Sequence, residues 1–216
     1  MQAESWQADS WTVYGVKGWG SVLAEALLIR CEVPYQFVDV EGFDEDGPAR
    51  DRLVALNPLA QVPTLISAGG TIMTESVAIA LLLAERHPEA GLAPPAGSAA
   101  RPAFLRRLVW FGTAVYPTFT YADYPQRWAP AEPEVLRERT REHRRSLWRD
   151  YEQALANHAE AVNPHSATGI FVSVMTRWGP GRPWFEANCP NLAAIAHAVD
   201  DAADLKPLWA LNFPQG

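Results

Sequence analysis

The sequence predicts an α/β domain in the first half of the chain and an all-α domain in the second half. Three observations support this fold class. Residues 12–40 alternate as strand, helix and strand, and residues 64–86 form a hairpin pattern followed by a helical one. After residue 87 a Pro- and Ala-rich stretch gives way to apolar residues that recur at helical spacing.

The first strand is expected over residues 12–16, which are rich in β-branched and aromatic side chains. A glycine-containing turn ends it, and Ser21 is a candidate cap for a helix over 22–30. Pro34 ends that helix, and residues 35–40 alternate as a second strand. Such a βαβ unit normally gives a parallel, right-handed pair of strands.

The next elements complete a small sheet. A weak helix is expected over residues 49–55. Residues 64–66 and 71–73 flank the turn sequence Ser-Ala-Gly-Gly and read as a hairpin, and an apolar helix follows over 76–86. The order β-α-β-(α)-β-β-α matches a thioredoxin-like sheet.

The second half of the chain carries only helical patterns. Helices are expected over residues 103–116, 134–158, 167–178 and 192–202. We therefore expect a thioredoxin-like domain over 11–87, a linker over 88–100 and an all-α domain over 101–212. The first ten residues are expected to form a loose arm.

Composition excludes several classes of function. The chain has 216 residues, is 48% hydrophobic and carries a formal charge of −7, which argues against nucleic acid as a partner. The longest apolar run, at 77–84, is far too short to span a bilayer, so no membrane association is expected. The first residues do not form a secretory signal.

Cysteine and histidine usage points to a reducing compartment without a metal. The two cysteines, Cys31 and Cys189, lie far apart in the sequence and form no disulfide framework. The five histidines show no ligand spacing, so no metal site is expected. We predict a cytoplasmic protein.

One stretch suggests a binding site for a small peptide. Asn57–Ile66 reads as a turn and a Val-Pro peptide that opens a strand, and Glu75-Ser76 stands at the start of the helix over 76–86. An exposed backbone edge and a helix N-terminus would then lie near each other. A purely structural interpretation is also open, in which Pro63 starts a strand and Glu75 and Ser76 cap a helix.

Over residues 11 to 212 the chain resembles a cytosolic glutathione S-transferase of the bacterial type. The likeness is carried by Asn57–Leu65 and Met73–Ile79, and more loosely by Cys189–Leu192 and Trp209. The resemblance implies glutathione as co-substrate. It also implies a cis Val62–Pro63 bond, a glutathione backbone paired with Val62, and a γ-glutamyl group held by Glu75, Ser76 and the helix N-terminus.

Catalysis in this family lowers the pKa of the glutathione thiol, because the thiolate is the nucleophile. By resemblance, Tyr14 stands at the position of the Tyr-type members. Glycines occupy the positions of the Ser-type and Cys-type residues, and Ser21 is the nearest hydroxyl. Three donors to the thiolate stay open: the Tyr14 hydroxyl, the Ser21 hydroxyl, and backbone N–H groups of residues 19–21. Tyr14 and Ser21 also have structural interpretations, as a strand residue and a helix cap.

The resemblance further implies a second-substrate pocket between the sheet and the helical domain. The candidate lining residues are Trp19, Trp110 and Tyr116, which would favour hydrophobic electrophiles. Most aromatic side chains of this region are expected to fill the core. Gly169 replaces the Asp that the family usually has in the capping motif begun by Ser166, so part of a helix cap is expected to be missing.

Three functions remain open from the sequence. The first is a detoxifying transferase that conjugates glutathione to a hydrophobic electrophile. The second is another glutathione-dependent enzyme, such as a peroxidase, disulfide reductase or isomerase. The third is a non-catalytic interaction module on the same scaffold. The resemblance implies a homodimer in each case.

Overall fold

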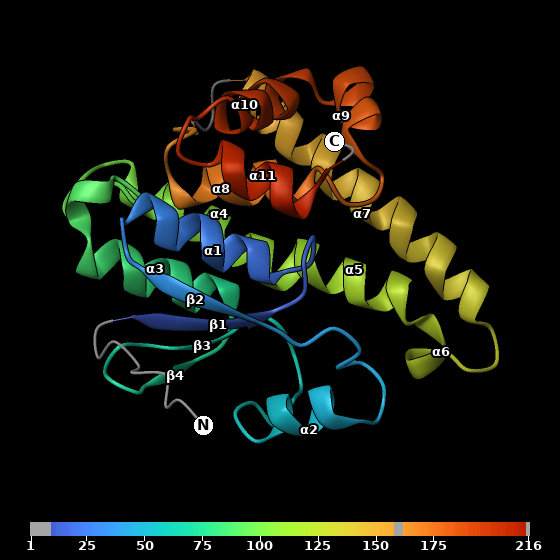
Figure 1. Ribbon diagram of the computed structural model, residues 1–216. Coiled ribbons are helices and arrows are strands. Elements are labelled where there is room, and N and C mark those ends of the chain that lie inside the picture. Colours follow the sequence, from blue (N-terminus) through green and yellow to red (C-terminus); the bar gives the residue numbers. More distant parts are fainter. Residues whose placement is uncertain (1–9, 158–161, 215–216) are drawn as a thin grey trace. The chain divides into compact units, whose positions relative to one another are not determined.

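The computed structural model describes residues 10–157 and 162–214, and the elements are labelled in Figure 1. The expected loose arm at residues 1–9 lies outside the described residues. The chain divides into two compact units, one formed by residues up to Leu92 with those from Ala203 on, the other by Ala93–Ala202. The sequence predicts a helical domain that runs to residue 212, whereas the structure groups the last segment with the first unit.

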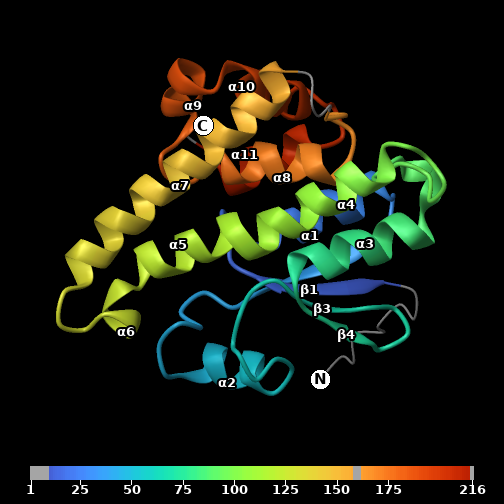
Figure 2. The same cartoon turned by 180° about the vertical axis from the view of Figure 1, so that it is seen from behind.

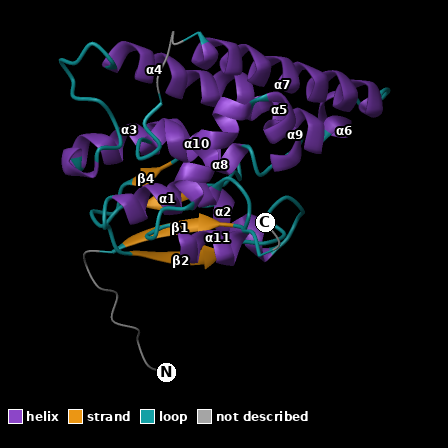
Figure 3. Ribbon diagram, turned by 90° about the horizontal axis from the view of Figure 1, so that it is seen from above, coloured by secondary structure: helices purple, strands orange, loops and turns teal. Residues whose placement is uncertain are grey.

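The first unit contains a four-stranded mixed sheet in the order β2-β1-β3-β4. Its elements are β1 (Trp11–Gly15), α1 (Ser21–Arg30), β2 (Tyr35–Asp39), α2 (Pro48–Val54), β3 (Thr64–Ile66), β4 (Ile72–Met73), α3 (Ser76–Arg86), a 3-10 helix (Pro88–Ala90) and α11 (Lys206–Asn212). β1 runs parallel to β2 and antiparallel to β3, and β3 pairs antiparallel with β4. This arrangement confirms the predicted thioredoxin-like sheet, and Figure 3 shows β1 and β2 side by side.

Alternation along β1 separates the two faces of the sheet. Trp11, Val13 and Gly15 are buried on one face. A Cβ atom at Gly15 would overlap the Cβ of Ser21, so α1 packs closely against this face. Tyr14 points to the other face, where it packs on a cluster that includes Leu53 of α2. Figure 1 shows α1 and α3 on one side of the sheet and α2 on the other.

The C-terminal segment is attached to the start and the end of α1. The side-chain oxygen of Asn212 accepts a hydrogen bond from the Gly18 N–H at 2.9 Å. Arg30 and Asp204 form an ion pair at 3.1 Å. These contacts explain why α11 belongs to the first unit although the sequence places it after the helical domain.

The second unit is helical, as predicted. Its elements are α4 (Arg101–Trp110), a π-helix (Phe111–Val115), α5 (Tyr116–Asp123), α6 (Pro125–Trp128), α7 (Pro133–Ala156), α8 (Ala167–Met175), α9 (Arg182–Asn188) and α10 (Pro190–Asp200). α8 is buried along its whole length and forms the centre of the unit. Figure 2 shows α4 and α5 continuing each other, with α7 running beside α5.

A π-turn joins α4 to α5. Pro117 has no N–H to donate within the helix, so the regular bonding pattern is interrupted just before it. The Tyr116 N–H instead donates to the carbonyl of Phe111, five residues back. The sequence predicts one helix over 103–116, and the structure extends it to Asp123 through this bulge.

The start of α8 has one of the two hydrogen bonds of the expected capping motif. Ser166 caps the helix by accepting a hydrogen bond from the Gly169 N–H at 3.3 Å. This bond is the half of the motif that the sequence retains, because Ser166 is present. The cap loses only the reciprocal bond that an acidic side chain at Gly169 would make.

Among the described residues, none of the helices combines the length and hydropathy that a membrane crossing requires.

Candidate functional site

The turn that leads to Val62 is held by buried side-chain hydrogen bonds. Asn57 is buried, and its amide donates to the carbonyl of Gln61 and to the Thr64 hydroxyl, both at 3.2 Å. The same side chain accepts from the Leu59 N–H at 3.1 Å, and the Thr64 hydroxyl donates to Gln61 at 2.8 Å. Asn57 and Thr64 therefore position the residues just before Val62. From the sequence, Asn57 is expected in a turn and as the first residue of the family signature; an Asn side chain in a turn commonly hydrogen-bonds to nearby main chain.

Val62 presents unpaired main-chain groups. The Val62–Pro63 bond is cis, as the resemblance implies. Val62 is half-buried, and no described residue forms a hydrogen bond with its N–H or C=O. An extended ligand could therefore pair with both groups as an added strand does.

The N-terminus of α3 is open to a ligand. Glu75 has φ 63° and ψ 105°, an uncommon backbone conformation for a non-glycine residue, and its side chain is exposed. No side chain caps the helix within the described residues. The first helical bond runs from the Ile79 N–H to the Glu75 carbonyl, so the N–H groups of residues 76–78 are available.

The hairpin brings these two features to the same end of the sheet. β3 and β4 pair Leu65 with Met73 and Ile66 with Ile72. Following this register toward the open end of the hairpin places Pro63 opposite Glu75. An unpaired main-chain edge and the positive end of an 11-residue helix therefore lie close together in the first unit.

The structure argues against Ser21 as an activator of a thiol. Its side chain is fully buried, its hydroxyl donates to the Val16 carbonyl at 2.9 Å, and it accepts from the Val16 N–H at 3.2 Å. The hydroxyl proton is therefore already committed within the fold. Ser21 does not cap α1 either, because the N-cap residue is Gly20 and no side chain bonds there.

Two candidate donors to a thiolate remain. The Tyr14 side chain is half-buried on the same cluster as Val62, and no described residue forms a hydrogen bond with its hydroxyl. β1 pairs Tyr14 with Thr64, two residues after Val62. At the start of α1 the Trp19 N–H donates to the Val16 carbonyl, whereas the N–H groups of Gly20 and Ser21 have no acceptor among the described residues.

The candidate pocket residues fall into separate groups. Trp19 belongs to the first unit, is 40% exposed and contacts Phe43 edge-on. Trp110, in the second unit, packs among Phe111, Trp148 and Tyr151. This packing matches the expectation that many aromatic side chains of the region fill the core.

Tyr116 belongs to a different aromatic group of the second unit. Its ring centroid lies 6.5 Å from that of Phe119 and 5.9 Å from that of Trp178. Tyr116 and Trp178 are half-buried, so parts of both rings are open. Trp110 and Tyr116 therefore pack in different aromatic groups of the second unit.

Other reactive groups do not add to the site. Cys31 and Cys189 are both buried, and burial raises the pKa of each thiol to about 12. Within the described parts of the chain, no three His, Cys, Asp or Glu side chains gather where they could hold a metal ion.

Comparisons with known proteins assign the family. A model of the glutathione S-transferase N-terminal domain matches residues 22–91. The chain is 48% identical over 201 residues to the uncharacterized GST-like protein YncG of Escherichia coli K12, covering 93% of this chain and 97% of that protein. This chain belongs to the glutathione S-transferase family.

Solved structures show the same fold. A Sulfitobacter glutathione transferase homologue with bound glutathione is 20% identical, with a TM-score of 0.80 over 93% of this chain and 97% of that one. A sphingomonad glutathione S-transferase complexed with glutathione is 23% identical, with a TM-score of 0.72 over 91% and 96%. These likenesses support the fold class expected from the sequence, a thioredoxin-like domain and an all-helical domain.

Proposed function

We propose that this protein binds glutathione and transfers its thiolate to a hydrophobic, electrophilic small molecule. The observation that carries the proposal is the unpaired main chain of Val62 beside the uncapped N-terminus of α3. The cysteinyl unit of glutathione would pair with Val62, as an added strand does. Its γ-glutamyl carboxylate would accept hydrogen bonds from the N–H groups of residues 76–78 and from Ser76, where the helix dipole favours an anion.

The exposed Glu75 carboxylate complements this arrangement. Its backbone conformation holds it at the helix mouth, where it would face the ammonium group of the γ-glutamyl unit. A strained residue is retained at a site only when the surrounding structure enforces it, and such residues cluster at ligand sites. We assign Glu75 to recognition of the ammonium group and Ser76 to recognition of the carboxylate.

Thiol activation falls to Tyr14 or to the N–H groups of Gly20 and Ser21. Each of these groups can donate to a thiolate, which lowers the pKa of the thiol. Titration of the thiolate absorbance of bound glutathione distinguishes the two. A raised thiol pKa in Tyr14→Phe identifies the hydroxyl as the donor, and an unchanged pKa identifies the amides at the start of α1.

Calorimetric titration with glutathione tests the binding site. We expect Glu75→Gln and Ser76→Ala each to weaken glutathione binding about tenfold, the equivalent of ~1.4 kcal/mol. Glu85→Gln is the matched control, because Glu85 is an exposed carboxylate on the same helix. Equal affinities for wild type, Glu75→Gln and Ser76→Ala would refute the assignment.

Activity assays separate the possible reactions. Turnover with 1-chloro-2,4-dinitrobenzene supports the transferase, and turnover with a hydroperoxide alone supports a peroxidase on the same site. A non-catalytic glutathione-binding module is a second candidate, favoured by the commitment of the Ser21 hydroxyl to Val16. Glutathione binding without turnover of either substrate would support it. We further propose a cytoplasmic homodimer, which sedimentation of the purified chain tests.

A further inference from the structure

The second unit contains a buried guanidinium with incomplete hydrogen bonding. Arg144 of α7 is only 4% exposed. Its Nε and Nη1 atoms are buried and have no hydrogen-bond partner among the residues that the structure describes. A buried charged group without acceptors is costly, and native proteins rarely leave one without a partner.

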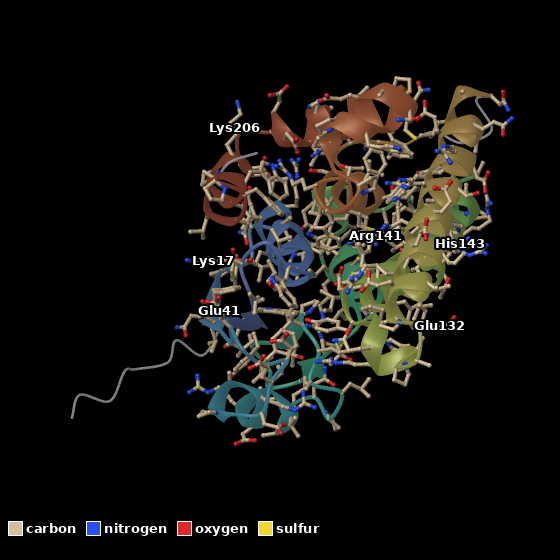
Figure 4. All side chains as sticks on the ribbon, turned by 90° about the vertical axis from the view of Figure 1, so that its right-hand side faces the viewer. Lys17, Glu41, Glu132, Arg141, His143 and Lys206 are labelled. Carbon is tan, nitrogen blue, oxygen red and sulfur yellow. The ribbon has the colours of Figure 1, made fainter. Side chains whose placement is uncertain are left out.

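No carboxylate neutralises this charge at close range. Within the described chain, Arg144 forms no ion pair within 4 Å. Asp123 is the carboxylate whose charge acts on Arg144, and the same Asp123 is also influenced by Arg137 and Arg141. Positive charge therefore exceeds negative charge around Arg144. Figure 4 labels the neighbouring Arg141 on the same helix. Burial lowers the pKa of Arg144 to about 10, so the guanidinium is still charged at neutral pH.

Arg182, a partly buried arginine of the same unit, differs in this respect. Arg182 also has buried nitrogens without partners, but its Nη2 forms an ion pair with Asp200 at 2.8 Å. Arg182 also donates to the Ser173 carbonyl at 3.0 Å. Its charge is thus compensated within the fold, whereas that of Arg144 is not. The comparison leaves Arg144 with N–H donors that no described residue uses and without an ion pair.

The surroundings of Arg144 suit the apolar part of such a ligand. The guanidinium carbon lies 4.1 Å from the ring centroid of Phe119, which contacts Trp178 at 5.1 Å between centroids. Tyr116 is the third member of this aromatic group. The side chains of Tyr116 and Trp178 are each partly exposed to solvent. Gly179 adds no side chain here: a Cβ at that position would lie 3.4 Å from Arg144 Nη2.

We propose that Arg144 binds the carboxylate of a small aromatic or unsaturated acid, whose apolar body lies against Tyr116, Phe119 and Trp178. A guanidinium offers paired N–H donors that match the two oxygens of a carboxylate. This inference does not depend on the proposed function, because all the residues that carry it belong to the helical unit.

Direct binding tests the site without any reaction. Calorimetric titration of the full chain with 4-nitrobenzoate and with 4-nitrobenzamide compares an anion with a neutral molecule of the same shape. We expect wild type to bind the acid at least tenfold more tightly than the amide. Arg144→Met should weaken binding of the acid at least tenfold and leave binding of the amide unchanged, and Arg144→Lys should retain part of the preference.

Controls separate charge recognition from folding. Arg139→Met removes an exposed arginine of the same helix and should change neither affinity. Arg144→Met replaces a buried, unpaired charge by an apolar side chain of similar length, so we expect its melting temperature to equal or exceed that of wild type. Equal affinity of wild type for acid and amide, no binding of either probe, or unchanged binding of the acid by Arg144→Met would overturn the proposal.

Discussion

At the scale of single residues, the hydroxyl of Ser21 holds the turn between β1 and α1 by bonding both main-chain groups of Val16. Replacement by alanine would leave the buried Val16 N–H without a partner, whereas the Val16 carbonyl would keep its hydrogen bond from the Trp19 N–H at 3.1 Å. We expect Ser21→Ala to lower the free energy of unfolding by about 1–3 kcal/mol, measured by urea denaturation. Ser146→Ala, which removes an exposed hydroxyl on α7, should be neutral within about 0.5 kcal/mol. Equal stability of both variants would contradict the structural role of Ser21.

Glu25 is a buried carboxyl in the middle of α1. One oxygen accepts a hydrogen bond from the Tyr35 hydroxyl at 3.0 Å, and the other has no partner among the described residues. Burial raises the pKa of Glu25 to about 7, although the Tyr35 hydrogen bond and the charge of Lys17 act in the opposite direction. The protonated form is therefore favoured in the folded protein.

This shift makes stability depend on pH. The folded-state pKa of Glu25 lies above the ordinary value of 4.5, so its contribution is fully present below about pH 4.5 and is lost as pH rises through about 7. We expect the unfolding free energy of wild type to fall by on the order of 3 kcal/mol over this range relative to Glu25→Gln. Denaturant titrations of both proteins at several pH values measure the difference. A constant difference across pH 4.5 to 8 would contradict the shift.

The residue scale also shows what sequence reasoning could and could not assign. The order of Val62, Glu75 and Ser76 in the sequence predicts that a main-chain edge and a helix N-terminus lie near each other, because their placement follows from the hairpin. The choice between Tyr14 and Ser21 depends on which hydroxyl is already bonded, and only coordinates show this. Nothing in the sequence indicates that Arg144 is buried, because it lies in a run of alternating charges that is typical of a solvated helix face.

At the scale of elements, α7 caps α10 through a side chain. The Glu152 carboxylate is buried and accepts hydrogen bonds from the N–H groups of Asn191 and Leu192 at 2.9 Å and 3.0 Å. It also accepts from the Asn191 side-chain amide at 2.6 Å. A carboxylate at a helix N-terminus satisfies free N–H groups and interacts favourably with the helix dipole.

Removal of this cap should be costly. We expect Glu152→Ala to lower the free energy of unfolding by about 3 kcal/mol, and Glu152→Gln to lower it less because an acceptor is retained. Glu138→Ala removes an exposed carboxylate of the same helix and serves as the control. Chemical denaturation followed by circular dichroism measures all three, and a loss in Glu138→Ala as large as in Glu152→Ala would contradict the assignment.

The start of α8 shows why a family pattern can fail locally. A Cβ at Gly169 would lie 2.5 Å from the carbonyl oxygen of Pro164, which is closer than any side chain tolerates. The main chain before α8 therefore occupies the space that the usual Asp would need. The sequence reveals the replacement but not its cause, since the cause is the path of residues 163–165.

Long helices were predictable, whereas of the short helices α2 was expected, as a weak helix over residues 49–55, and three others were not. The periodic patterns of α1, α3, α7, α8 and α10 gave their positions within a few residues. α6, α9 and α11 have at most seven residues and begin with or near a proline, so they show too few turns for a periodicity to emerge. All three were absent from the sequence-based expectation.

At the scale of the whole molecule, the proposed ligand should stabilise the fold. A ligand that binds only the native state adds about 2.7 kcal/mol at a concentration of 100 Kd. For a chain of 216 residues this corresponds to a rise in Tm of roughly 5–10 °C. Thermal denaturation with and without glutathione measures the rise. Ser76→Ala should show a smaller shift at the same glutathione concentration, and an unchanged Tm in wild type would contradict binding.

The main-chain character of the Val62 contact has a consequence for mutational studies. The N–H and C=O groups that no described residue engages are common to nearly all amino acids, so truncation of the Val62 side chain leaves them in place. Alanine scanning therefore does not detect this part of the proposed recognition. Removal of the donor requires a residue without an N–H, and Val62→Pro is the one natural substitution that achieves it.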